Sequence, residues 1–308
     1  MESTDRASDA KLKGAKPMIA KYIDRVPKNF MSTRYSTFFY LSAGILSLFV
    51  ARTLLAARFP VPRMNDLFTV ITLAGSLVIL LSRHDRITTL DWLIGLGTGL
   101  FVGVTMQYAT LFNPYDFWGI VQSNSGQAWV RGVSVVVAML GGLAIMRHGG
   151  PVQVSLAQVD YRKTFMSLII GLAVGAPLAI LNVFALQLTQ GQPIAWQSPF
   201  AALSDAFQPA VVEEVVYRFA FLGLMWMLIR RSMPRSAGWL AGLLALFAHN
   251  FMHFDDLWLQ APLTALGMGL VMALIWGVPP TILALRRDLE SAIAFHWIQD
   301  VARFLAGF

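Results

Sequence analysis

The sequence predicts an all-α protein, a polytopic transmembrane helix bundle with about eight or nine spans. Hydrophobic residues make up 56% of its 308 residues and charged residues only 13%, which is about half the share usual in a soluble domain. Apolar runs long enough to cross a bilayer recur from Thr37 onward. Such runs are expected to be helices, because lipid offers no partner to an unpaired backbone group.

Nine apolar segments are candidates for these spans. They are residues 37–55, 68–82, 88–110, 131–147, 164–188, 207–229, 237–257, 261–285 and 289–306. The second segment is short, so it is either a re-entrant segment or no span at all, which would leave eight. We divide the chain into a basic tail (1–36), N-terminal transmembrane helices (37–200) and a transmembrane core (201–308) that contains the polar motifs described below.

The distribution of Lys and Arg predicts the orientation of the chain. The tail contains eight Lys or Arg and four Asp or Glu, and it lacks the apolar stretch of a secretory signal. The connections at 83–87, 148–163, 230–235 and 286–288 are also basic, and with nine spans they lie on the same side as the tail. We expect an integral membrane protein of the plasma or inner membrane, with a cytoplasmic N-terminus and an external C-terminus.

Composition also excludes some classes of function. The chain has no cysteine, which excludes disulfides and thiolate chemistry. Its net charge of +7 does not indicate binding to nucleic acid, because the basic residues lie mainly in the tail and in short loops. The expected partner of the surface is therefore the lipid bilayer.

Ionisable residues inside the apolar segments are concentrated in the last 100 residues. Those deep within a segment, rather than near its ends, are Glu213, Glu214, Arg218, His249, His253, His296 and Asp300. A charge inside the bilayer costs several kcal/mol unless it is paired or hydrated, so such residues are candidates for a functional site. For a single histidine, a hydrogen-bonded place in the core is the usual alternative. Scattered structural groups, however, are not expected to gather in one third of the chain.

The stretch "AVVEEVVYR" contains two adjacent glutamates with different expected roles. Glu214 and Arg218 are four residues apart, so they can pair on one helix face. Glu213 is rotated by about 100° from Glu214 and points elsewhere. We therefore expect Glu214 to be a structural acid and Glu213 to be free, with a purely structural pair of acids around Arg218 as the alternative.

Two further pairs have the same spacing. His249 and His253 in "FAHNFMH" are expected on one face of the next helix, and His296 and Asp300 in "FHWIQD" on one face of the last. Counting about 1.5 Å per residue from the loops places Glu213, His249 and Asp300 at similar depth, so one pocket can contain them all.

A metal site is the alternative reading of the histidine pair. His249 and His253, with a carboxylate, have a spacing that can ligate a divalent metal. The glutamate of the zinc-protease motif H-E-x-x-H is absent between them. We therefore expect no cofactor, with a divalent metal as the less favoured alternative.

These motifs, in this order on three helices, resemble the CAAX-protease and bacteriocin-processing (CPBP) family of intramembrane glutamic proteases. The matching positions are Glu213, Glu214, Arg218, His249 or His253, His296 and Asp300. The resemblance covers about residues 205–308, whereas the first 200 residues match only in having several spans. It implies an endopeptidase that hydrolyses a peptide bond in or near the membrane, in a membrane-associated peptide or protein.

The resemblance also implies a role for each residue. Glu213 would be the general base that activates water, and Glu214 and Arg218 would support it. The histidine of the middle motif would help to hold the water. His296 and Asp300 would stabilise the oxyanion.

Two positions depart from the family pattern. The middle motif is usually F-x-x-x-H, but no phenylalanine stands four residues before His249 or His253, so both histidines stay candidates. Asp300 stands where asparagine is common, and an ionised aspartate cannot donate to an oxyanion. It would have to be protonated or to orient His296.

Two other functions remain open at this stage. Buried acids and histidines also relay charge in proton- or ion-coupled transporters. No inverted repeat of the kind common in transporters is visible in this sequence. The other possibility is a non-catalytic immunity or scaffold protein with the same fold.

Overall fold

The structure is a computed structural model that describes residues 35–308, so the predicted tail lies almost entirely outside the described residues. Within 35–308 the chain is helical and contains no strand, only an isolated bridge between Phe117 and Val121. The predicted all-α fold class is confirmed. The longer helices are α2 (Ser36–Ala56), α3 (Met64–Arg83), α4 (Thr89–Gln107), α5 (Asn124–Arg147) and α6 (Tyr161–Gln190). The second half contains α7 (Pro199–Asp205), α8 (Phe207–Glu213), η4 (Glu214–Phe221), α9 (Leu222–Ile229), α10 (Ala237–Phe251), η5 (Met252–Phe254), α11 (Leu257–Gln260), α12 (Pro262–Met272), η6 (Ala273–Gly277), α13 (Val278–Arg286) and α14 (Leu289–Leu305).

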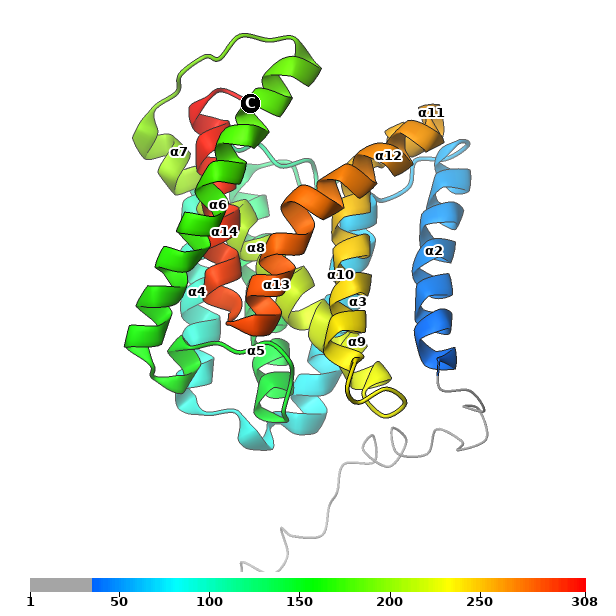
Figure 1. The fold of residues 1–308 in the computed structure, drawn as a ribbon, viewed down its shortest axis with the longest axis vertical. Coiled ribbons are helices and arrows are strands. Elements are labelled where there is room, and N and C mark those ends of the chain that lie inside the picture. Colours follow the sequence, from blue (N-terminus) through cyan, green and yellow to red (C-terminus); the bar gives the residue numbers. More distant parts are fainter. Residues whose placement is uncertain (1–34) are drawn as a thin grey trace, which may run out of the picture.

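Six helices in the described chain are long and apolar enough to cross a membrane. They are α2, Met64–Arg86, α4, α5, α6 and Pro262–Arg286. The second predicted span, thought short enough to be re-entrant, is instead a full-length helix that begins at Met64. These helices stand side by side in a bundle (Figure 1).

The other three predicted spans are helical but do not meet the same criteria of length and composition. Helices α10 and α14 have 15 and 17 residues. Residues 207–229 form three short pieces, α8, η4 and α9, with η4 a π-helix. Between them these segments carry the ionisable residues identified above. They lie among the longer helices, where α14 packs against α6, α8 and α13, and α10 against α9, α12 and α13 (Figure 1).

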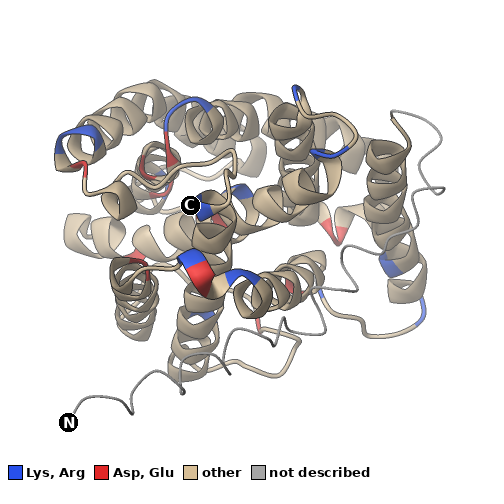
Figure 2. Ribbon diagram, turned by 90° about the horizontal axis from the view of Figure 1, so that it is seen from below, with Lys and Arg blue, Asp and Glu red and all other residues tan. Residues whose placement is uncertain are grey.

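The basic residues follow the connections between helices. The start of α2 and the C-terminus lie at opposite ends of the bundle (Figure 1). In the view from below, most of the visible Lys and Arg lie in loops and near helix ends (Figure 2). This distribution leaves the long helices almost free of charge, as a bilayer requires.

Close packing of α4 on α5 depends on glycine. A Cβ on Gly99 would lie 2.6 Å from the carbonyl oxygen of Gly132, and one on Gly132 would lie 2.9 Å from that of Gly99. No larger side chain fits at this crossing. Small residues allow such close backbone approach in membranes, where helix association relies on van der Waals packing.

A buried carboxylate fastens the start of α14 to the rest of the bundle. Asp288 accepts hydrogen bonds from the hydroxyl groups of Ser155 at 2.7 Å and Ser167 at 2.5 Å, and from the backbone N–H of Ser291 at 3.0 Å. Its side chain is fully buried. These bonds join α14 to α6 and to the loop before it, which fixes the helix that carries His296.

Three buried side chains hold the loop between α4 and α5. Asp205 accepts from the backbone N–H groups of Thr110 and Leu111 at 2.7 and 2.6 Å, and from that of Phe112 at 3.3 Å. Asp66 accepts from the N–H of Trp118 at 3.0 Å. The third is Gln127, whose amide donates to the carbonyl groups of Tyr115 at 3.1 Å and Val121 at 2.7 Å. The loop is therefore fixed in place.

Candidate active site

The two glutamates lie at the junction of two kinds of helix. Glu213 is the last residue of α8, and Glu214 is the first residue of the π-helical segment η4. A π-helix widens the turn and is often found at functional sites. Here it carries Glu214 and Arg218 into the interior while Glu213 stays at its edge.

Glu214 belongs to a closed group of buried charges. Its Oε1 atom pairs with Arg218, and it also accepts from the Nδ1 side of His296 at 2.8 Å. The Nε of Arg218 donates in turn to the hydroxyl of Thr281 on α13 at 3.3 Å. Glu214 is fully buried and Arg218 is 2% exposed. The predicted pairing of Glu214 with Arg218 is therefore confirmed, and the group joins three helices.

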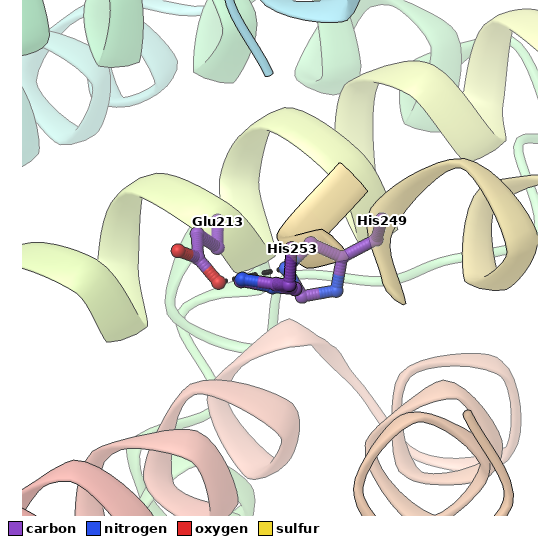
Figure 3. A group of neighbouring side chains, drawn as sticks. All are labelled: Glu213, His249 and His253. Atoms are coloured by element: carbon purple, nitrogen blue, oxygen red, sulfur yellow. Dashed lines mark hydrogen bonds and ion pairs between the residues drawn. The ribbon is translucent and has the colours of Figure 1, made fainter. Parts of the chain in front are cut away.

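Glu213 belongs to an open group. Its Oε2 atom lies 2.7 Å from Nε2 of His249 and 3.7 Å from Nε2 of His296. Its side chain is 23% exposed, in contrast to the complete burial of Glu214. Figure 3 shows Glu213 and His249 facing each other across the gap between their helices, joined by the hydrogen bond. Counting residues from the loops predicted that Glu213 and His249 lie at similar depth in the bundle.

His253 does not share a regular helix face with His249, which corrects the sequence prediction. Helix α10 ends at Phe251, and His253 lies in the short 3₁₀ turn that follows. The turn is held by Asp255, whose carboxylate accepts from the backbone N–H of Met64 at 2.8 Å. The two imidazole rings still lie 5.3 Å apart between centroids, and His253 is the exposed one.

His253 also approaches Glu213. The ligand atoms of Glu213, His249 and His253 all lie within 4.8 Å of one another, a spacing that could hold a metal ion (Figure 3). One carboxylate and two imidazoles are typical protein ligands of catalytic zinc, which leaves further coordination positions open. The geometry is therefore compatible with the alternative metal site that the histidine spacing suggested.

Asp300 contacts His296 but is not its closest partner. Its Oδ2 lies 3.4 Å from Nε2 of His296, while its Oδ1 pairs with Arg303 at 2.9 Å. The shortest contact of the His296 ring is the one from Nδ1 to Glu214. The orientation of His296 is thus set mainly by Glu214, a contact that the sequence did not predict.

Most of these groups line one cavity of about 810 Å³. It contains six of the seven predicted site residues, namely Glu213, Arg218, His249, His253, His296 and Asp300. Glu214 lies behind its wall. Apolar side chains of α6 and of the α12–η6 segment, such as Leu186, Met268 and Val271, form much of the rest. A cavity with apolar walls and a few converging polar groups is the usual form of a binding site.

Other polar residues of the cavity were missed in the sequence. Tyr217 donates to Oδ1 of Asn65 at 2.8 Å, and its ring lies 4.8 Å from that of His249. Arg303 follows Asp300 by three residues, a spacing that signals a helical ion pair. Arg131 was placed at the edge of a predicted span, but α5 begins seven residues earlier, at Asn124. The serine before it, Ser123, caps the helix and was the available signal.

Comparison of the chain with protein-family models, with curated proteins and with solved structures finds no match in any of the three.

Proposed function

We propose that this chain is an intramembrane endopeptidase in which Glu213 activates water to hydrolyse a peptide bond in or near the membrane. The proposal rests on one observation, the meeting of Glu213 with His249 and His296 in a cavity with apolar walls. The order of the motifs, which resembles that of the CPBP family, is consistent with it. The substrate class is a membrane-associated peptide or protein.

In the proposed reaction Glu213 takes a proton from the attacking water. A general base must lie within hydrogen-bond reach of the proton that it removes, and the exposed edge of the Glu213 carboxylate faces the cavity. His249 holds that carboxylate at 2.7 Å and limits its rotation. Of the two candidate histidines, His249 therefore suits the middle-motif role better than the exposed His253.

His296 suits the role of oxyanion donor. Its Nδ1 is engaged by Glu214, which Arg218 anchors, so the ring has a fixed direction. The opposite nitrogen, Nε2, lies between Glu213 and Asp300 at the cavity wall. As an imidazolium, His296 donates to Glu214 and to the developing oxyanion at the same time. Fixed donors of this kind supply a large part of the rate gain in acyl transfer.

Asp300 has a supporting role in this scheme. An ionised aspartate accepts hydrogen bonds but donates none. Its pairing with Arg303 and its contact with His296 fit an acid that orients the imidazole. This assigns Asp300 to positioning, and the oxyanion contact to His296.

The test is comparative proteomics of membrane-protein termini in cells that produce the wild-type chain or Glu213→Gln. Glutamine keeps the size of the side chain and its contact with His249 but is not a general base. We expect new termini in the wild-type cells that are missing from the variant, with equal protein levels. Identical sets of termini at equal expression would contradict the proposal.

A metal-dependent form of the same hydrolysis is the second candidate, favoured by the cluster of Glu213, His249 and His253. In that form His253 is a ligand and its removal lowers metal affinity as well as activity. Elemental analysis of purified wild-type chain and of His253→Ala separates the two. Stoichiometric metal that is lost in His253→Ala supports this form, whereas metal-free protein with chelator-resistant activity excludes it.

A further inference from the structure

Arg131 is a buried cation in the cavity that the proposed reaction does not use. It lies on α5, seven residues after the helix begins, so it is about 10 Å along the helix axis from the first residue. Only 9% of its surface is exposed, and it lines the same cavity as Glu213. A charge inside a membrane costs free energy, so a buried ionisable group in a membrane-spanning helix is a candidate for a functional role.

The guanidinium group is held in one orientation but leaves donors free. Its Nε donates to Oε1 of Gln127 at 3.1 Å, and the amide of Gln127 is itself fixed by the carbonyl groups of Tyr115 and Val121. Within residues 35–308, its two Nη groups have no hydrogen-bond partner and it forms no ion pair. A planar, pre-oriented guanidinium matches the two oxygens of a carboxylate.

Two acids interact electrostatically with Arg131 without forming an ion pair with it. They are Glu213 on α8 and Asp66 on α3. Glu213 is bonded to His249, and Oδ2 of Asp66 accepts from the backbone of Trp118. Asp66 and Glu213 offset the charge of Arg131 at longer range, so its Nη donors remain available to a ligand in the cavity.

We infer that Arg131 forms an anion subsite of the cavity, which binds a carboxylate of the peptide substrate. The polar side chains of Asn65, Thr69 and Tyr115 line the cavity as well, so the carboxylate enters a polar part of the cavity. The carboxylate belongs either to the C-terminus of the peptide or to an Asp or Glu side chain. The inference rests on the proposed peptidase function.

The test measures binding without cleavage, using the purified full chain with Glu213→Gln. The probes are three apolar heptapeptides of matched sequence: one with a free C-terminal acid, one with a C-terminal amide, and one amide with a single internal glutamate. Titration calorimetry in detergent micelles gives each Kd. We expect at least one carboxylate peptide to bind about tenfold more tightly than the plain amide, the size of one good charge-assisted contact. The tighter of the two identifies the source of the carboxylate.

The preference must depend on Arg131. In Glu213→Gln/Arg131→Gln, the ratio of the Kd of the plain amide to that of the tighter carboxylate peptide should fall below about twofold. In Glu213→Gln/Arg131→Lys, which keeps the charge but not the planar pair of donors, this ratio should be intermediate. The matched control is Glu213→Gln/Arg230→Gln, because Arg230 lies in the basic connection 230–235 and does not line the cavity. It should keep the Kd ratio of the parent chain. Equal binding of all three peptides to the parent chain overturns the inference, as does a preference that survives Arg131→Gln.

Failure of this inference can be distinguished from failure of the proposed function. If Glu213→Gln still cleaves substrates, the peptidase assignment to Glu213 is wrong, whatever the peptides do. If Arg131→Gln does not fold, Arg131→Lys and the parent chain still decide, since the parent alone must show the preference for a carboxylate.

Discussion

Two carboxylates of this protein, the buried Asp288 and the partly buried Glu213, have opposite surroundings. Donors from three directions surround Asp288, and neither of its oxygens faces a cavity. Glu213 has one close partner, His249, and one side open to a space of about 810 Å³. Both acids lie at helix ends in an apolar protein, so their position in the sequence does not distinguish them.

The difference shows how a carboxylate becomes structural or reactive. A carboxylate whose oxygens are all bonded within the protein stabilises the fold, and breaking that network leaves buried donors unpaired. A carboxylate with a free side can accept a proton from a ligand. Glu214 adjoins Glu213 but is also enclosed: its Oε1 atom contacts Arg218 and His296, and its Oε2 atom is buried and has no hydrogen-bond partner within residues 35–308.

The largest expected effect is on activity, at Glu213. Glu213→Gln should lower the cleavage rate of a substrate found by the terminal proteomics by about 10³-fold, within the range for loss of a general base. The unfolding midpoint in SDS–detergent mixtures should stay unchanged, because glutamine keeps the contact with His249. Cleavage at the wild-type rate in Glu213→Gln would show that Glu213 is not the general base, so it would not differ from Asp288 in reactivity.

The largest effect on stability is expected at Asp288. Asp288→Ala should lower the free energy of unfolding by about 3 kcal/mol, because two hydroxyl groups and a backbone N–H lose their acceptor in the interior. Tryptophan fluorescence during SDS titration measures the change. A loss of activity without loss of stability would show that Asp288 is not merely structural.

The next effect separates the two histidines. His249→Gln should lower the cleavage rate by about 10²-fold, because Glu213 loses the partner that orients it. His253→Gln is expected to lower the rate by less than about threefold in the metal-free mechanism, since it does not bond to Glu213. A comparably large loss in His253→Gln would favour the metal-dependent form, in which both histidines are ligands.

The smallest effect is expected at Ser167, one of the donors to Asp288. Ser167→Ala should lower the free energy of unfolding by about 1–2 kcal/mol and leave cleavage unchanged, because the lost hydroxyl donates to Asp288 and accepts from the Nε of Arg287. Ser155 continues to donate to the same oxygen in this variant. An effect as large as that of Asp288→Ala would show that the two serines do not share the carboxylate.

Local spacing explains why parts of the site could be predicted. Glu214 and Arg218 meet because residues four apart lie on one face of a helix, whatever surrounds them. The meeting of Glu213 with His249 followed from a count of residues along two helices of known rise.

Other parts could not be predicted because they depend on contacts between distant segments. Helix α10 ends before His253, and the turn that follows is fixed because Asp255 accepts a hydrogen bond from the backbone N–H of Met64, 191 residues away in the chain. The ring of His296 is directed by Glu214 rather than by the neighbouring Asp300, because of how α14 is rotated against η4.

The sequence by itself determined that this is a bundle of apolar helices and that ionisable groups gather in its last third, because apolar composition and helical spacing act locally. Only the tertiary structure decided which acid is enclosed and which is open, and that Arg131 lines the same cavity as Glu213. Enclosure is a property of the space between helices. It depends on how segments far apart in the chain pack, and no local pattern encodes it.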